Sequence, residues 1–157
     1  MKKIIFLVSM VIMLLTTSCL KGPASGGTSA SDFSGKLVVT NTESGKVTYT
    51  DNSAVVTITI PNILEPKLNL FFKEVKFAEA MPIKLNLELT GIPFTVTVSE
   101  DGLSRNYVFD ATDIIPTGFD SDYKIDRVWG SVGKTIDIRF IMAERESMVQ
   151  FTVVPEE

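Results

Sequence analysis

Few side chains in this 157-residue sequence are suited to catalysis, and histidine is absent. Without histidine there is no usual general base, no usual zinc ligand and no serine–histidine triad. The single cysteine, Cys19, follows directly on an apolar run in the stretch LLTTSCLKGP. The pair Gly26-Gly27 lies in a Ser- and Ala-rich stretch that lacks the pattern of a phosphate-binding loop. Carboxylates are therefore the remaining candidates for chemistry.

The carboxylates form three close sets along the sequence. These sets are Asp110 with Asp113, then Asp120, Asp122 and Asp126, and finally Glu144 with Glu146. A glycosidase needs two carboxylates held across a cleft, which linear spacing alone does not provide. The triplet at 120–122 resembles part of a calcium-binding loop but lacks its glycine and its closing glutamate. We interpret all three sets as solvated acids of turns, and we expect no catalytic residue, no metal and no cofactor.

The N-terminal segment has the three regions of a secretory signal peptide. Met1-Lys2-Lys3 is followed by an apolar run from Ile4 to Leu15, and small polar residues come next. A helix of about 12 residues reaches about 18 Å, which is shorter than the ~30 Å hydrocarbon core of a bilayer. We therefore predict that residues 1–18 are a signal peptide rather than a transmembrane helix.

The residues around the cysteine carry a resemblance of their own. Leu15-Thr16-Thr17-Ser18-Cys19 resembles a bacterial lipobox, in which the cysteine is acylated and the chain is cleaved just before it. The resemblance implies that Cys19 carries palmitate-type acyl chains. Two or three such chains, at ~0.8 kcal/mol per buried CH₂, give stable membrane anchoring. The alternative is a secreted protein with an incidental cysteine near its cleavage site.

The next residues predict a flexible tether over 19–32, followed by one domain over 33–157. The stretch LKGPASGGTSAS is rich in Gly, Ser and Ala. In some gut anaerobes an acidic cluster after the acylated cysteine marks export to the outer cell face, and this stretch has no such cluster. We therefore expect an exported protein that is anchored in the outer membrane and faces the periplasm. Loss of the signal peptide removes two lysines and no acid from a chain of net charge −4, so we expect no nucleic-acid partner.

Period-two alternation dominates the sequence from Phe33 onward and indicates strands. It is clearest in the segments 55–60, 83–90, 94–99, 135–140 and 148–153. Turn signals occur between them at Ser44-Gly45, Asp51-Asn52, Asp101-Gly102, Val132-Gly133 and Glu144-Arg145-Glu146. Strands and short turns at this spacing predict an all-β antiparallel meander of about eight to ten strands, closed into a single barrel.

Two segments need separate interpretation. Residues 67–80 have apolar side chains at helical spacing, but they also fit strand alternation in two pieces, one ending at Phe72 and one starting at Val75. Because Pro66 and Pro82 bracket the segment and no residue caps a helix, we predict a strand, with a helix across the barrel mouth as the alternative. Residues 111–122 read as a long connection with apolar residues inside it, and such connections are often lids or binding loops.

Aromatic residues are spread over almost every predicted strand. In a closed barrel of about eight strands, inward side chains either fill the interior or line one small ligand cavity. A packed core is the first alternative. For the second, a cavity, we expect the lining residues to be Phe72, Phe77, Phe94, Tyr107, Phe109, Trp129 and Phe140.

Three short motifs resemble one family. They are the block VKFAEAMPI at 75–83, Gly91-Ile92-Pro93, and FSGKL at 33–37. Together they resemble the calycin-like, distantly lipocalin-like, β-barrel lipoproteins of anaerobic gut bacteria, over most of residues 33–154. The resemblance implies a calycin- or lipocalin-like barrel that follows a lipobox. It transfers no catalytic or binding residue.

We therefore expect a lipid-anchored barrel protein of the cell envelope that is not an enzyme. The first hypothesis is that it binds a small, largely apolar ligand in or at the mouth of the barrel. The second is a structural or interaction module that docks another envelope protein. The third is a carboxylate-dependent hydrolase, which would need Asp110, Asp113 and Asp126 to face one another in a cleft.

Overall fold

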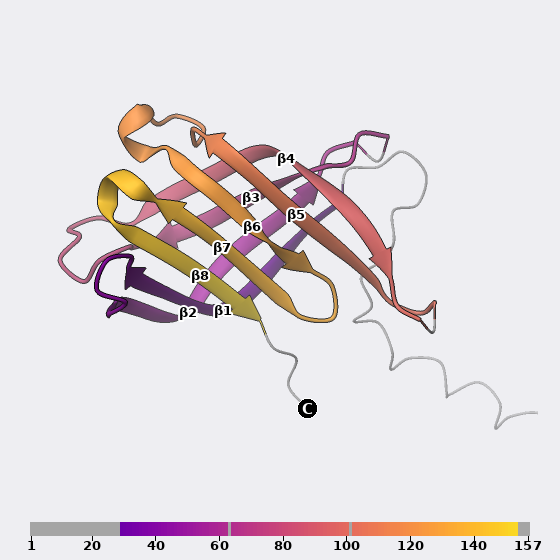
Figure 1. Ribbon diagram of the computed structural model, residues 1–157, viewed down its shortest axis with the longest axis horizontal. Coiled ribbons are helices and arrows are strands. Elements are labelled where there is room, and N and C mark those ends of the chain that lie inside the picture. Colours follow the sequence, from indigo (N-terminus) through magenta and orange to yellow (C-terminus); the bar gives the residue numbers. More distant parts are fainter. Residues whose placement is uncertain (1–28, 63, 101, 154–157) are drawn as a thin grey trace, which may run out of the picture.

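The computed structural model describes residues 29–62, 64–100 and 102–153, and it is an eight-stranded antiparallel barrel (Figure 1). The strands follow one another around the barrel in sequence order, and β1 closes it by pairing with β8. This confirms the predicted all-β meander. The strands are β1 (Ser29–Asn41), β2 (Val47–Ile60), β3 (Lys67–Val75), β4 (Leu85–Val98), β5 (Arg105–Ile114), β6 (Ile125–Val132), β7 (Ile136–Met142) and β8 (Ser147–Val153).

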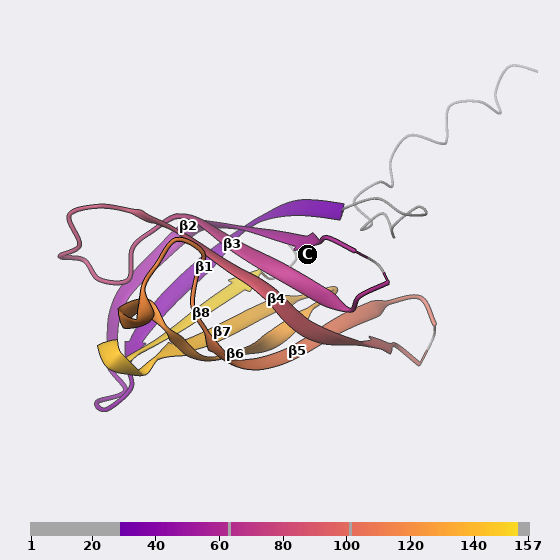
Figure 2. The ribbon, with the colours of Figure 1, turned by 90° about the horizontal axis from the view of Figure 1, so that it is seen from above.

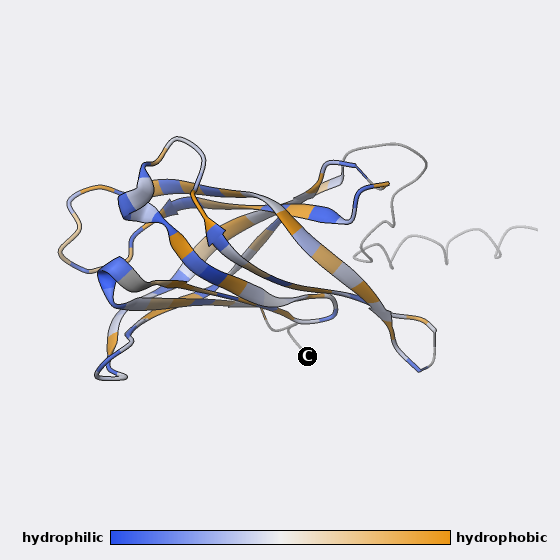
Figure 3. Cartoon of the chain, turned by 45° about the horizontal axis from the view of Figure 1, so that its top comes forward, coloured by the Kyte–Doolittle hydropathy of each residue, from blue (hydrophilic) through white to orange (hydrophobic). Residues whose placement is uncertain are grey.

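Figure 3 shows apolar and polar residues alternating along the strands, and most of the apolar ones are buried in the barrel core. In β7, for example, Ile136, Ile138, Phe140 and Met142 are buried, while the residues between them are partly exposed. Burying apolar surface provides about 25 cal/mol per Å², so this inward face is the main source of stability in a chain whose described part has no buried polar residue.

Strand β3 contains the irregularity that divides the alternation of residues 67–80 into two pieces. Its ladder with β4 shifts between Phe72 and Val75, where two residues stand opposite the single residue Asn86. This is a β-bulge, and Glu74 within it has a φ of 47°. The extra residue changes the phase of the alternation, so Phe72 and Val75 are both buried although they are three residues apart. The predicted strand is confirmed over Lys67–Val75, whereas residues 76–80 belong to the connection to β4.

Two boundaries differ from those expected. Strand β1 begins at Ser29, inside the segment predicted as tether, and Ser29–Gly35 pairs with Ile60–Ala54 of β2. The carboxylate of Asp32 accepts hydrogen bonds from Lys73 and Thr57, which ties this polar stretch to its neighbours. The signal peptide at 1–18, Cys19 and the tether up to residue 28 lie outside the described residues.

The other difference is at Asp51-Asn52, which the sequence marks as a turn. The structure has a second β-bulge there, inside β2, because Gly35 pairs with Ala54 while Leu37 pairs with Asp51. Asp51 Oδ1 accepts a hydrogen bond of 2.8 Å from the backbone N–H of Ser53. This local bond is the turn chemistry that the sequence shows, but the strand continues through it.

Aromatic rings from opposite walls meet inside the barrel. Strands β3 and β7 stand four positions apart in the ring of eight, and Figure 2 shows them on opposite sides. The ring of Phe72 in β3 nevertheless lies edge-on to that of Phe140 in β7, with 5.3 Å between centroids. Phe151 of β8 adds an edge contact to Phe72 at 6.4 Å. Side chains therefore fill the interior at this level.

The neighbouring residues Phe71 and Phe72 test this assignment of inside and outside. Phe72 is fully buried, whereas Phe71 lies on the outer wall. We expect Phe72→Ala to lower the free energy of unfolding by about 3–5 kcal/mol, because it leaves a cavity where opposite walls meet. Phe71→Ala, the matched control, is expected to cost about 1 kcal/mol. Urea unfolding measures both, and equal losses would contradict the placement.

Candidate functional site

The structure divides the predicted lining residues into three groups. Phe72, Phe109 and Phe140 are buried in the core, and Phe77 packs on Phe140 with 6.0 Å between ring centroids. Phe77 follows β3 and covers the interior at the end where β3 and β4 are joined. Phe94 and Tyr107 form a separate edge-on pair at 5.3 Å, partly buried, on the paired parts of β4 and β5.

The third group is Trp129 alone, and its prediction as an interior residue is wrong. Trp129 pairs laterally with Asp110 of β5 and Arg139 of β7, whose side chains lie on the outer wall. The guanidinium of Arg127 lies over its ring at 5.0 Å from the centroid. This is cation–π geometry at the surface, and it does not bring Trp129 near the other six aromatic residues.

One hollow is a groove on the outer wall across β2, β3 and β4. It has a volume of about 410 Å³, within the range of ligand-binding pockets. We call it the β2–β4 groove. It is lined by Asp51, Ser53, Ala54, Val55, Phe71, Lys73, Glu74, Lys84 and Asn86.

The two β-bulges described above both border this groove. The bulge in β2 lies between Asp51 and Ala54, and the bulge in β3 lies between Phe72 and Val75. A bulge bends its strand and redirects the side chains beside it, which is why bulges are common next to functional sites. Here the ladder between β2 and β3 runs only from Val55 to Thr59, so the two strands separate at the groove.

This separation leaves one edge of β2 without a neighbouring strand. The ladder of β2 with β1 continues to Val47, whereas its ladder with β3 ends at Val55. Among the described residues, 47–54 therefore pair with β1 alone. An edge of this kind presents backbone N–H and C=O groups that an extended peptide can pair with.

The groove has an apolar floor and charged walls. Val55 and Phe71 form the partly exposed floor, and cations and anions of both walls surround it. Lys73 is bound to Asp32 at 2.7 Å, and the hydrogen bond from Lys73, followed by the one from Thr57, lowers the pKa of Asp32 below 3.8. Glu74 and Lys84 are exposed, and within the described part of the chain neither forms an ion pair.

One polar contact fixes the shape of the groove wall. The side chain of Asn86 accepts a hydrogen bond of 2.9 Å from the backbone N–H of Glu74, inside the β3 bulge. Asn86 is the single residue opposite this bulge. Its side-chain oxygen therefore accepts from the Glu74 N–H, which has no partner in the interrupted ladder. The wall of the groove is thus held by strands rather than by a loop.

A second hollow of about 290 Å³ marks where β4 and β5 separate. Their ladder covers only Phe94–Val98 of β4 and Arg105–Phe109 of β5. Beyond it the connection after β5 bridges the gap, since Thr117 donates its backbone N–H to the carbonyl of Glu88 at 2.9 Å. The lining is mostly apolar, and its one carboxylate, Asp110, is bound to Arg127.

The connection predicted at 111–122 is shorter than expected. Strand β5 continues through Ala111 to Ile114, and a 3₁₀ turn occupies Ser121–Tyr123. The remaining residues pack down on the barrel, because Pro116 is buried and the ring of Phe119 lies 4.8 Å from that of Tyr123. This segment closes the gap between β4 and β5 instead of standing away from the barrel as a lid.

The candidate carboxylates on β5 and β6 are held by cations on the outer wall. Asp110 accepts two hydrogen bonds from Arg127, at 2.9 and 2.6 Å, and these bonds lower the pKa of Asp110 below 3.8. Lys124 lies between Asp126, at 3.2 Å, and Asp113, at 3.3 Å. Hydrogen bonds to Asp126 first and Asp113 second raise the pKa of Lys124. Two acids are thus brought together, but around an ammonium group on a surface and not across a cleft.

Two further observations concern metals and membranes. In the part of the chain that the structure describes, no three acidic or thiol side chains are placed to hold a metal ion. No helix within residues 29–62, 64–100 or 102–153 has the length and apolar character needed to cross a bilayer.

The comparisons with known proteins place the chain in no family. No protein-family model matches it, and neither a curated protein nor a solved structure does. The class that the coordinates define is therefore an eight-stranded meander barrel with an outer groove.

The groove was missed at the sequence level, although one signal for it is visible. In alternating strands one of two consecutive phenylalanines must face outward, and Phe71-Phe72 is such a pair. An outward phenylalanine beside a valine of the next strand marks a partly apolar outer surface. The alternation alone does not tell which phenylalanine faces outward, because its phase changes at the bulge in β3. That bulge depends on pairing with β4.

The pair of Asp110 and Arg127 predicts a pH dependence. A carboxylate with a lowered folded-state pKa contributes stability above its unfolded pKa and loses that contribution as the pH falls through the folded value. We expect Asp110→Asn to lower the urea midpoint slightly at pH 7, because both groups are exposed. The difference from the wild type should shrink below pH 3.8. Arg127→Gln, the matched control, should show the same profile, and a difference that persists unchanged at pH 2 would contradict the assignment.

Proposed function

We propose that this protein is a lipid-anchored, non-enzymatic interaction module of the cell envelope, which docks an extended polypeptide segment of another protein in the β2–β4 groove. The observation that carries the proposal is the pair of bulges that opens this groove beside a free edge of β2. The barrel acts as the rigid support, and acyl chains on Cys19 hold it at the membrane.

The packed interior supports docking on the outer wall over binding of an apolar ligand inside. Phe72, Phe140 and Phe151 meet from separate walls, so a ligand at this level would have to displace buried rings. Exchanging such contacts inside a close-packed core is costly. The outer groove needs no such rearrangement, because its floor and walls already face solvent.

The chemistry of the groove indicates what kind of partner it fits. A purely apolar ligand would leave the charges of Glu74 and Lys84 without partners and in part desolvated. A polypeptide supplies side chains of both charges, an apolar side chain for the floor at Val55 and Phe71, and a backbone for the edge of β2. Asp51 and Lys73 already bond to Ser53 and Asp32 of the same protein. They therefore shape the walls of the groove and are not free to pair with a partner.

The carboxylate arrangement supports a role without catalysis. Asp110 is bound to Arg127, and Asp113 and Asp126 share Lys124. None of these pairs lies in the β2–β4 groove, so the groove and the candidate acids are on different surfaces. The resemblance to calycin-like lipoproteins is part of the same proposal, and the meander barrel is consistent with it.

Replacing the cysteine tests the anchor. We expect Cys19→Ser to release the processed chain from the membrane fraction, because the acyl chains provide the binding energy. Ser18→Ala, which leaves the thiol in place, is the matched control and should remain bound. Mass spectrometry of the N-terminal peptide gives a direct readout. An unmodified cysteine in a chain that stays membrane-bound would falsify acylation as the anchor.

Photo-cross-linking tests the groove. A benzophenone side chain placed at Ser53, in the groove, should form an adduct with one partner in intact envelopes, whereas the same group at Thr112 on the outer face of β5 should not. Phe71→Ala should abolish the adduct at position 53 while leaving the barrel folded, because it removes the apolar floor. Peptide mapping should place the cross-link in an extended segment.

Three outcomes would overturn this part of the proposal. They are equal adducts at positions 53 and 112, an adduct at 53 that persists in Phe71→Ala, and no adduct at either position. Binding of a small apolar ligand instead would appear as a saturable change in the intrinsic fluorescence of the protein without any cross-link.

A further inference from the structure

Three features lie at one end of the barrel: the first described residue and two exposed turns. Strand β1 starts there at Ser29, the β2–β3 turn spans residues 61–66, and the β4–β5 turn spans residues 99–104. Because the strands form an antiparallel meander, these three features must lie at the same end, as Figures 1 and 2 show. We call it the Ser29 end.

The two most exposed large apolar side chains among the described residues lie at this end. Leu64 in the β2–β3 turn is 88% exposed, and Leu103 in the β4–β5 turn is 86% exposed. At the opposite end the corresponding residues are Val47, Ile83 and Ile115, which are 52–61% exposed. Exposure of a leucine side chain to water is unfavourable, so burial of both leucines against an apolar partner would lower the free energy.

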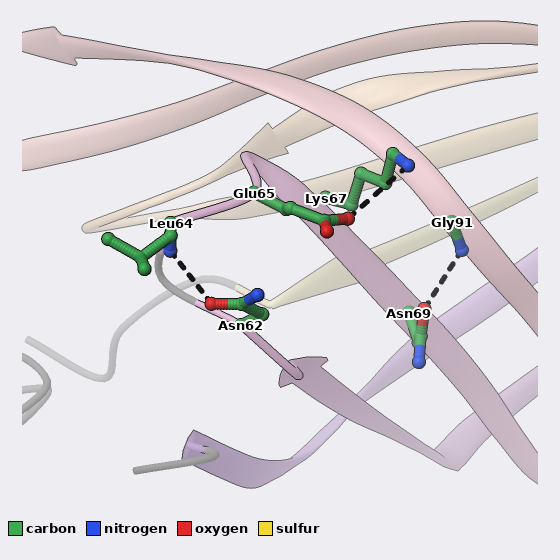
Figure 4. A network of polar contacts seen from close by, with 6 residues as sticks. All are labelled: Asn62, Leu64, Glu65, Lys67, Asn69 and Gly91. Carbon is green, nitrogen blue, oxygen red and sulfur yellow. Dashed lines mark hydrogen bonds and ion pairs between the residues drawn. The ribbon is translucent and has the colours of Figure 1, made fainter. Parts of the chain in front are cut away.

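Both leucines are held by ordered turns. Figure 4 shows that Leu64 donates its backbone N–H to Asn62 Oδ1 at 3.0 Å, while Glu65 and Lys67 form an ion pair at 3.5 Å. The carbonyl of Pro66 accepts a hydrogen bond from Phe94, which ties this turn to β4. Leu64 therefore projects from a fixed base.

The β4–β5 turn is braced in a similar way. Ser99 and Ser104 exchange hydrogen bonds through backbone and side chain, at 2.9 to 3.3 Å, and Gly102 bonds to the carbonyl of Ser99 at 2.9 Å. Gly102 has a φ of 71°, which this tight turn requires. Leu103 thus lies between Gly102 and Ser104, which both bond to Ser99.

The β4–β5 hairpin extends beyond the ladder between β3 and β4. Lys67, the first residue of β3, pairs with Pro93, and β4 continues to Val98 beyond that point. Five further residues at about 3.3 Å each project the hairpin by about 17 Å. Val96 and Val98 on this extension are 48% and 58% exposed, so they continue the apolar surface from Leu103 towards the barrel.

We infer that the Ser29 end contacts the lipid bilayer directly, with Leu64 and Leu103 inserted at the level of the headgroups. This inference rests on the anchoring proposed above. Cys19 precedes Ser29 by ten residues, a span of at most about 35 Å even when fully extended, so the proposed anchor keeps this end within that distance of the membrane.

The charges of this end indicate how it meets the bilayer. Beside the two leucine turns, the described charges Lys67 and Arg105 are offset by Glu65 and Glu100, so these turns have no strong excess of either sign. Contact is therefore apolar, through leucine and valine side chains at the interface, and it does not require anionic lipids.

Tryptophan fluorescence in vesicles tests this contact. Leu64→Trp and Leu103→Trp are introduced separately into a Trp129→Phe background of the full, acylated chain, which removes the only native tryptophan. Ile83→Trp, at the opposite end and 61% exposed in the native chain, is the matched control. Each protein is reconstituted in neutral phosphatidylcholine vesicles with or without brominated lipid.

We expect brominated lipid to reduce the fluorescence at positions 64 and 103 by about twofold, with a blue shift, and to leave position 83 unchanged. Flotation of the same vesicles reports anchoring separately. A chain that floats but shows no quenching at 64 and 103, or equal quenching at 83, overturns the bilayer contact and leaves the anchor standing. A chain that does not float overturns both.

Discussion

The contact between Phe72 and Phe140 across the interior is the constraint on which the rest of this structure depends. It joins strands that stand farthest apart in the ring, so it sets the separation of the walls. With Phe151 and Phe77 it forms one aromatic column from the centre of the barrel to the end where β3 and β4 are joined. Because buried aromatic side chains fill the interior at this level, the proposed recognition surfaces lie on the outer wall and at the turns.

The β2–β4 groove shows how such a barrel can gain a site without weakening its core. Each bulge adds one residue to a strand, and the added residues face outward while Ala54, Phe72 and Val75 stay buried. Under the proposed docking role, stability and recognition depend on opposite faces of the same strands. Side chains such as Ser53 or Lys84 can then change with little effect on the fold, which suits a surface that must match a partner.

The sequence was sufficient for the fold class because alternation is a local property. The pattern at 135–140 predicts a strand without any knowledge of its neighbours, and β7 covers it. Trp129 shows where this local reasoning fails. Ile125 and Val128 are both buried although they are three residues apart, so the alternation has no single phase there, and only pairing with β5 and β7 determines which side Trp129 takes.

The start of β1 and the groove could not be predicted for a related reason. The first residues of β1 are small and polar like those before them, and they become a strand because β2 lies beside them and because Lys73, far along the chain, binds Asp32. The groove exists where β3 departs from β2, which is a matter of register between distant segments. Register of this kind is set by the whole sheet and not by any single stretch.

The position of β1 has a mechanical consequence. Its residues pair with β2 on one side and, from Lys36 to Asn41, with β8 on the other. Interstrand hydrogen bonds run perpendicular to the strands. A pull on the chain at Ser29 along the strand axis therefore loads two ladders in shear at once, and many bonds must break together rather than one after another. A barrel joined to its surroundings through this strand is built to bear load.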